Sequence, residues 1–345
     1  MPSVRDLVTH SPKLNDPSTD TAQAIVQSVY GGPEVLHLET VKKPALKDEH
    51  SVLVRLRAAS VNAGDWHLMR GQPFFIRLMF GTLKKPKIRT LGADMAGEVE
   101  AVGAAVTQFQ PGDAVFANLS EHGFGAFAEY VCVPESALVA KPSNLSFEAA
   151  AAVPAAAMTA LQGLRESGQL QPGQKVLING ASGGVGSFAV QIARALGAEV
   201  TAVCSGQKRD MVQSLQPHHI VDYTQTDITQ TEQRYDLMLD AAAFRSVFDY
   251  LPILHPGGTY VLVGGGTDRF LQTALLGGLI SRLSRRRVTS LMMEPKQEDL
   301  QTLKDMVEAG QIQPAVDRCY PLEQVPDAIR YVEQRQVQGK VVIRM

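Results

Sequence analysis

Cysteine is scarce in this sequence, and no Cys-x-x-Cys pair is present. The three cysteines, Cys132, Cys204 and Cys319, lie far apart along the chain. We therefore expect neither a disulfide framework nor a zinc site built from clustered thiolates. A reducing compartment fits this cysteine content, which predicts a cytoplasmic location.

Long apolar runs and an excess of charge of one sign are also absent. No apolar stretch is long enough to span a bilayer. The formal net charge of -2 gives no overall attraction to nucleic acid or acidic lipid, although local basic patches remain open. Residues 1–20 have neither the apolar run of a secretory signal nor the Arg-rich bias of a transit peptide. We expect residues 1–21 to form a disordered tail.

What is present predicts two domains, since 345 residues exceed one ordinary core. Short strands separated by turns dominate residues 22–150, which predicts a β-rich, barrel-like or sandwich-like domain. From Lys175 onward, strands alternate with helices, which predicts a doubly wound parallel sheet. The late strand Lys340–Ile343 could rejoin the first domain. The predicted division is 22–150 with 311–345 for one domain and 151–310 for the other.

A glycine-rich turn is the strongest local motif. The apolar strand Lys175–Asn179 leads into the turn, and a helix is predicted to follow over Ser187–Leu196. Glycine lets the backbone approach a pyrophosphate closely, and the helix N-terminus offers N–H donors to the anion. A strand–helix turn without a ligand is the alternative. The predicted cofactor contacts at this turn are Ala181, Ser182, Gly183, Gly184, Val185 and Gly186.

The residues after the second strand of this unit favour NADPH over NADH. NADH-binding chains usually place an acidic residue about 20 residues past the glycine turn. Ser205 lies near that position, and Lys208 and Arg209 follow it. A 2′-phosphate is stabilised by cations and hydroxyl donors and repelled by a carboxylate. In the alternative interpretation, Lys208 and Arg209 only form the solvated face of a helix.

Five segments give the chain a resemblance to a known family. It resembles the medium-chain dehydrogenase/reductase superfamily and, within it, the zinc-independent quinone oxidoreductase branch. That branch includes bacterial NAD(P)-dependent alcohol dehydrogenase-like proteins and the chloroplast envelope quinone oxidoreductase group. The resemblance implies a GroES-like β-rich domain and a Rossmann domain with the active site between them. The segments are Ala58–Trp66, Leu91–Gly97, Gly125–Tyr130, Val153–Ala160 and the glycine turn.

The resemblance also implies positions for cofactor contacts. Ser205 and Lys208 match residues that contact the 2′-phosphate, and Tyr223 matches a tyrosine near the adenosine phosphate. Thr159 matches a threonine near the pyrophosphate and the nicotinamide ribose. Gly264 and Gly265 match backbone close to the nicotinamide.

Zinc relatives carry Cys or His ligands where this chain has Asn62, Ala93 and Ala155, so the resemblance implies a site without metal. Asn62 is the first catalytic candidate, as a donor to substrate or ribose. Asp65 would orient its loop, and Trp66 would form a wall of the pocket. For Asp65 the alternative is a purely structural carboxylate, held by hydrogen bonds in a turn or in the core.

Residues 268–287 combine an apolar stretch with a basic cluster, Arg285–Arg287. Such a segment is compatible with weak contact to an anionic membrane surface. A cleft-side helix or a subunit contact is the favoured interpretation. The following strand, Val288–Met292, is predicted to be an edge strand, and the pairing of such edges predicts a homodimer.

The resulting functional prediction is an NADPH-dependent, zinc-independent oxidoreductase that reduces a quinone or an α,β-unsaturated carbonyl by hydride transfer. Without zinc, nothing strongly polarises a simple alcohol, whereas hydrogen-bond donors can stabilise the oxygen of an activated acceptor. Two alternatives remain open. One is an enoyl-thioester reductase, and the other is a non-catalytic NADPH-binding redox sensor or membrane-associated protein.

Overall fold

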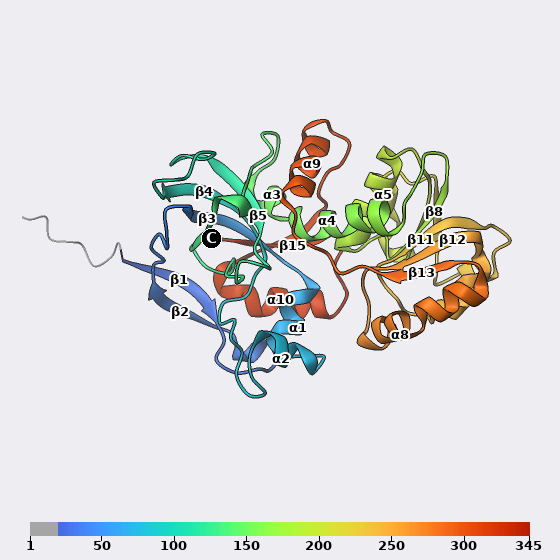
Figure 1. Ribbon diagram of the computed structural model, residues 1–345, viewed down its shortest axis with the longest axis horizontal. Helices are drawn as coiled ribbons and strands as arrows, with labels where there is room; N and C mark the ends of the chain where they lie inside the picture. Colours follow the sequence, from blue (N-terminus) through green and yellow to red (C-terminus); the bar gives the residue numbers. More distant parts are fainter. Residues whose placement is uncertain (1–19) are drawn as a thin grey trace, which may run out of the picture.

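The computed structural model describes residues 20–345, which form two large β-sheets toward opposite ends of an elongated molecule (Figure 1). The predicted tail falls almost entirely outside the described residues. Thr21 is an exception, because it begins a strand and pairs with Lys42. The prediction was wrong at that residue, since the pairing partner lies in a later strand.

The first sheet is largely antiparallel and has the order β14-β15-β3-β4-β5-β7, with β6 paired to β3. The last strand returns to this sheet, because β15 pairs antiparallel with β3. A separate two-stranded sheet, β1-β2, lies beside it. The strands are β1 (Thr21–Val26), β2 (His37–Lys42), β3 (Ser51–Val61), β4 (Asp94–Val102), β5 (Ala114–Asn118), β6 (Tyr130–Pro134), β7 (Val139–Ala140), β14 (Val316–Pro321) and β15 (Lys340–Arg344).

The second sheet is fully parallel, in the order β10-β9-β8-β11-β12-β13. The strand order reverses between β8 and β11, and ligands bind beyond the carboxyl ends of the strands at such a reversal. The predicted fold class, a GroES-like β-rich domain with a Rossmann domain, is confirmed. The strands are β8 (Lys175–Asn179), β9 (Glu199–Cys204), β10 (His219–Asp222), β11 (Tyr235–Asp240), β12 (Leu254–Leu262) and β13 (Arg287–Ser290).

Helices cover both faces of the parallel sheet, and further helices lie between the two sheets (Figure 1). Ser146 caps α3 by accepting from the backbone N–H of Ala149, and Pro154 begins α4, as its fixed φ allows at a first turn. The helices are α1 (Ala63–Arg70), α2 (Phe75–Phe80), α3 (Phe147–Ala151), α4 (Pro154–Gln162), α5 (Gly184–Ala195), α6 (Arg209–Ser214), α7 (Val247–Tyr250), α8 (Thr267–Ser284), α9 (Gln297–Glu308) and α10 (Val325–Glu333).

The helices depart in some details from the sequence pattern. A π-helical turn over Gly163–Ser167 continues α4 beyond Gln162. The helices α1 and α2 lie inside residues 22–150, where the sequence pattern predicts mainly short strands. None of the helices in residues 20–345 is long and apolar enough to cross a membrane.

The edge strand β13 is covered by the molecule's own helix α8. The backbone N–H of Val288 donates to Ser281 Oγ at 2.9 Å. A Cβ added at Gly277 would lie 3.1 Å from the carbonyl oxygen of Val288, so the helix passes very close to the strand there. Covering an edge in this way protects it from pairing with another chain. The edge position predicted for this strand is therefore confirmed, but its polar groups at Val288 are not free for a second subunit.

Candidate active site

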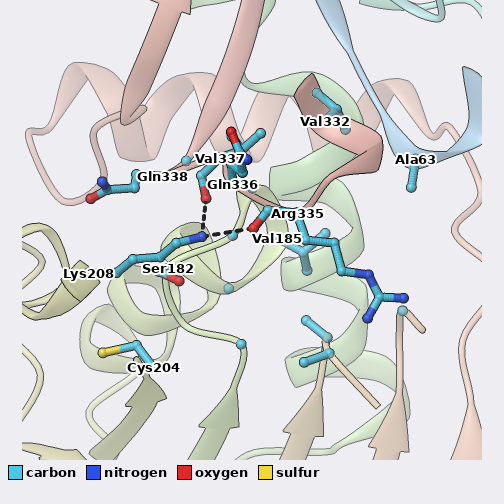
Figure 2. A pocket seen from close by; sticks show the side chains of 18 of the residues that line it. Ala63, Ser182, Val185, Cys204, Lys208, Val332, Arg335, Gln336, Val337 and Gln338 are labelled. Atoms are coloured by element: carbon cyan, nitrogen blue, oxygen red, sulfur yellow. Dashed lines mark hydrogen bonds between the residues drawn. The ribbon is translucent and has the colours of Figure 1, made fainter. Parts of the chain in front are cut away.

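A cleft of about 1180 Å³ lies between the two sheets. Three parts of the chain line it: the end of β3 with α1, the carboxyl ends of the parallel strands, and the segment from Val332 to Val341. This is the position expected from the reversal of strand order at β8 and β11. Figure 2 shows part of this cleft from close by.

The glycine turn forms one wall of the cleft, at the N-terminus of α5. Gly183 is the N-cap residue of α5, and no side chain caps the helix, so its first N–H groups are available to an anion. A Cβ at Gly186 would lie 2.1 Å from the carbonyl oxygen of Gly180, so only glycine fits where the helix packs on the turn. Of the predicted contacts, Ser182, Gly183, Gly184, Val185 and Gly186 line the cleft, whereas Ala181 is fully buried.

Ser205 and Lys208 also line the cleft, at the end of β9. The ammonium of Lys208 donates to the carbonyl oxygens of Arg335 and Val337, at 3.1 and 2.8 Å (Figure 2). Burial lowers the pKa of Lys208. Two of the three N–H donors of Lys208 thus bind the segment Arg335–Val337, which lies over the glycine turn. The third donor remains for a ligand. Arg209 begins α6, is exposed and does not line the cleft.

Two exposed aromatic side chains and a cation form one lip of the cleft. The rings of Tyr223 and Phe244 have centroids 6.2 Å apart, and both are about half exposed. The guanidinium of Arg335 lies over the ring of Phe244, 5.3 Å from its centroid. Flat apolar faces beside a cation suit a purine base and its phosphate. Tyr223 was predicted from the family resemblance, whereas Phe244 and Arg335 were not predicted.

Gly264 and Gly265 line the cleft directly after β12. A Cβ at Gly264 would lie 2.7 Å from the carbonyl oxygen of Ala241, which shows how closely the ends of β11 and β12 approach. Thr159 does not line the cleft, and its hydroxyl donates to the carbonyl oxygen of Ala155 within α4. The structure therefore brings most of the predicted cofactor contacts together and leaves Thr159, Ala181 and Arg209 outside the cleft wall.

A buried ionic cluster lies behind Asn62 on the opposite wall. Asp94 Oδ2 accepts from Asn62 Nδ2 at 2.9 Å and from Ser60 Oγ at 3.0 Å. Asp94 Oδ1 accepts from Asn118 Nδ2 and from the backbone N–H of Ala155. The ammonium of Lys340 donates to Asn62 Oδ1 and lies 3.5 Å from Asp94 Oδ2. Asn62 is thereby held between a cation and a carboxylate, which fixes the orientation of its amide.

Lys340 was not recognised as a site residue from the sequence. Its side chain is only 3% exposed, yet it lines the cleft. Burial lowers the pKa of Lys340, and the nearby carboxylates of Asp94 and Asp65 oppose that shift. Position 340 is far from Asn62 in sequence, and only the return of β15 to β3 brings the two together. Nothing local in the sequence marks this lysine.

Asp65 and Trp66 lie at the start of α1 and take different positions. Asp65 is fully buried and accepts from the backbone N–H groups of Asn62 and Gly92, at 2.7 and 3.0 Å. It does not line the cleft, so the structure places it as a support for the loop that carries Asn62. Trp66 lines the cleft and stacks on His67, with ring centroids 3.6 Å apart.

Asp65 gives the protein a pH-dependent stability of defined sign. Burial raises the pKa of Asp65 from its ordinary 3.8 to about 7, and the neighbouring Asp94 adds to this shift. Between pH 3.8 and about pH 7, Asp65 therefore holds a proton in the folded chain that it has released in the unfolded chain. The free energy of unfolding, relative to Asp65→Asn, should fall by up to about 1.4 kcal/mol per pH unit over this range and level off above it.

Urea unfolding of both proteins across this pH range measures the difference. Asp65→Asn is the appropriate reference because it keeps the shape of the side chain and cannot ionise. A difference that stays flat, or that grows in favour of the wild type as the pH rises, would contradict a buried and protonated Asp65.

Comparisons with known proteins agree with this layout. Residues 48–143 match the alcohol dehydrogenase GroES-like domain family, and residues 215–343 match the zinc-binding dehydrogenase family. The chain is 32% identical to the chloroplastic NADPH-dependent alkenal/one oxidoreductase of Arabidopsis thaliana, over 93% of this chain and 79% of that protein. It is 30% identical to the human mitochondrial NAD(P)H oxidoreductase RTN4IP1, over 100% and 93%.

A solved structure shows the same fold. The quinone oxidoreductase from Coxiella burnetii superposes with a TM-score of 0.82 at 26% identity, over 94% of this chain and 99% of that one. Identity of 30% or more to curated relatives across nearly the whole chain, together with the two domain matches, decides the family. The chain belongs to the medium-chain dehydrogenase/reductase superfamily, and relatives of it are named as quinone and alkenal oxidoreductases.

Proposed function

We propose that the protein is an NADPH-dependent, zinc-independent reductase of quinones or α,β-unsaturated carbonyls. The observation that carries this proposal is one cleft shared by the uncapped N-terminus of α5 and the Asn62–Lys340 cluster. The first feature suits a dinucleotide pyrophosphate, and the second suits an acceptor that gains negative charge. The names of the relatives support the same chemistry.

The residues present fit a dinucleotide. An added Cβ at Gly183 would meet only the carbonyl oxygen of Gly180, at 3.5 Å, which leaves open space at the helix N-terminus. At Gly184 it would lie 2.9 Å from Cδ of the buried Lys340, so a larger residue does not fit there. The lip formed by Tyr223 and Phe244 would hold the adenine, and Ser205 with Lys208 would hold the 2′-phosphate. When bound, NADPH supplies the hydride.

At the acceptor end, Asn62 is the residue we assign to the substrate oxygen. One of its two amide hydrogens goes to Asp94, which leaves the other for an acceptor in the cleft. The ammonium of Lys340 holds the carbonyl end of this amide and adds positive charge close to the cleft. Negative charge that develops on a quinone or enone oxygen is stabilised by such prearranged donors. Trp66 would form a flat apolar wall beside the acceptor.

The family name matched by residues 215–343 implies zinc, and the side chains here do not fit that metal. Zinc in such enzymes takes thiolate, imidazole or carboxylate ligands. Within residues 20–345 no three such side chains come together at one point. Next to Asn62 and Asp94 lies the ammonium of Lys340, a cation that would repel a metal ion. The proposed reaction therefore uses no zinc.

The direct test is consumption of NADPH, with NADH alongside, against quinones, short alkenals, enoyl thioesters and simple aldehydes. Turnover of quinones or alkenals with NADPH is the expected result. Turnover of enoyl thioesters alone would show that the protein is an enoyl-thioester reductase instead. Binding of NADPH without turnover of any acceptor would favour a non-catalytic sensor.

Lys208→Glu should reverse the preference between the two nicotinamide cofactors. The change replaces a cation near the expected 2′-phosphate with a carboxylate that repels it. We expect the KM for NADPH to rise about tenfold or more, since a hydrogen bond to a charged group is worth about 1.5–3 kcal/mol. The KM for NADH should rise much less, because only the contacts of Lys208 with the carbonyl oxygens of Arg335 and Val337 are lost in that case. Arg209→Glu is the matched control, because Arg209 does not line the cleft. An unchanged KM for NADPH in Lys208→Glu would show that Lys208 does not bind the 2′-phosphate.

Assembly and location are further parts of the proposal. A homodimer remains our prediction, but β13 pairing is disfavoured because α8 covers Val288. Light scattering of the purified chain would test the dimer. The cytoplasm remains our proposed location because the three cysteines are free thiols. The named relatives include chloroplastic and mitochondrial proteins, and cell fractionation would decide between these compartments.

A further inference from the structure

The helix α8 exposes an apolar stripe to solvent. Of its eighteen residues, only Thr273, Gly277 and Ile280 are buried. The outward leucines recur every fourth residue and so share one face. Two of them, Leu275 and Leu283, are 76% and 78% exposed. A contiguous apolar surface of this kind marks an interaction site. The α8 stripe consists of Leu271, Leu275, Leu279 and Leu283.

Positive charge borders the α8 stripe. From Arg269 to Met293 the sequence has five arginines and no acidic residue. The side chains of Arg282, Arg285 and Arg287 are exposed, and within residues 20–345 none of the three is ion-paired. These cations are not neutralised by the protein itself, although the chain as a whole carries a net charge of -2.

The region around α2 repeats this combination. None of the residues of α2 is buried. From Trp66 to Ala93 the sequence again lacks any acidic residue. The α2 patch consists of four exposed apolar residues, Phe74, Phe75, Leu78 and Met79, and three exposed lysines, Lys84, Lys85 and Lys87.

The chain segments just before α2 and at the start of α8 approach each other beside the cleft. A smaller hollow of about 270 Å³ is lined by Trp66 and His67 of α1, by Gln72 and Pro73 before α2, and by Gly266 and Thr267 at the start of α8. Trp66 and His67 also line the main cleft. In Figure 1 both α2 and α8 lie along the lower side of the molecule. The helices α2 and α8, which carry the two surfaces, therefore lie on either side of a hollow that adjoins the proposed active site.

A lipid surface fits this pair of patches better than a second copy of the chain. A second copy docked through the same face would offer these arginines no acidic residue between Arg269 and Met293, so their charge would stay uncompensated. The edge strand that would extend such a contact is occupied at Val288 by Ser281 and Gly277 of α8. An anionic bilayer offers negative headgroups to the cations and an apolar layer to the leucines at the same time.

We propose that the α8 stripe and the α2 patch dock the protein on an anionic membrane surface, with the entrance of the cleft facing the bilayer. An apolar acceptor dissolved in the bilayer would then reach the cleft without crossing water. This substrate route rests on the proposed reductase function. The docking itself does not, and it is measured without turnover.

Docking is tested by sedimentation of the full chain with phosphatidylcholine vesicles, with and without phosphatidylserine. We expect binding only to the anionic vesicles, and loss of binding at high salt, because exposed charges are screened there. Absence of binding to either kind of vesicle would overturn the docking proposal whatever the catalytic activity.

Two variants and one control localise the contact. Each cation near an anionic bilayer strengthens binding about fivefold, so R282Q/R285Q/R287Q should weaken it on the order of a hundredfold. L275S/L283S should abolish the binding that remains at low salt. The control K42Q/K47Q/R55Q removes three exposed cations of the first sheet region and should bind like the wild type. Equal weakening by the control would mean a non-specific charge effect and would overturn the assignment.

Substrate access and self-association are the remaining readouts. L275S/L283S should lose NADPH oxidation with a long-chain quinone embedded in anionic vesicles and keep it with a water-soluble short quinone. Loss with both quinones would overturn the access route. If a wild-type dimer instead dissociates in L275S/L283S and no vesicle binding occurs, the stripe is a subunit contact and the membrane proposal is wrong.

Discussion

Replacing Gly186 by alanine is expected to remove most NADPH binding. The added Cβ would lie 2.1 Å from the carbonyl oxygen of Gly180 and 2.8 Å from the Cα of Ala181. Both are backbone atoms, and the turn cannot yield easily, because the N–H groups of Gly180 and Ala181 both donate to the carbonyl oxygen of Val203. The N-terminus of α5 must therefore move away from β8, and its donors no longer converge on a pyrophosphate.

The cost of this substitution falls on binding and on stability. Overpacking of a closely packed site costs about 1–3 kcal/mol. We expect the dissociation constant for NADPH to rise by about tenfold or more for a comparable loss of binding free energy. Fluorescence titration with NADPH and urea unfolding measure the two effects. Gly278→Ala is the control, since a Cβ there meets nothing within 4 Å and alanine favours a helix. NADPH affinity equal to that of the wild type would show that the turn does not carry the cofactor.

The glycine turn was predictable because its evidence is contiguous. A strand, a turn and a helix follow one another within residues 175–196, and each has its own local pattern. Five of the six residues predicted at this turn line the cleft, and Ala181 is buried behind them. Arg335 and Phe244 could not, because they join the cleft from distant positions and belong to no motif. Their roles depend on how α10 and β11 are placed in the folded chain.

The features that the sequence did not reveal were hidden for physical reasons. The helices α1 and α2 are short. Because α2 buries none of its residues, its sequence has no periodic apolar face from which a helix could be predicted. The coverage of β13 depends on Gly277 and Ser281, two small residues whose importance appears only when α8 lies against the strand. The stripe on α8 was visible as an apolar segment. Its exposure could be decided only by seeing which side the sheet occupies.

Lys340→Met is expected to be the most destabilising single change at the acceptor end of the cleft. It removes the ammonium next to Asp94, a carboxylate that has no exposure to solvent. Breaking one partner of a buried ion pair costs about 3–5 kcal/mol, because the remaining charge is left uncompensated. Lys340 also holds down the pKa of Asp65, so its loss should raise that pKa further. Urea unfolding measures the loss of stability.

A double variant separates charge from packing. In Lys340→Met/Asp94→Asn no charge is left unpaired, so we expect much of the stability lost in Lys340→Met to return. Activity should not return with it, because Asn62 loses both groups that orient its amide. A single variant as stable as the wild type would mean that the pair is not ionised in the folded chain. A double variant that is stable and fully active would show that the acceptor is held by other residues than Asn62 and its two charged neighbours.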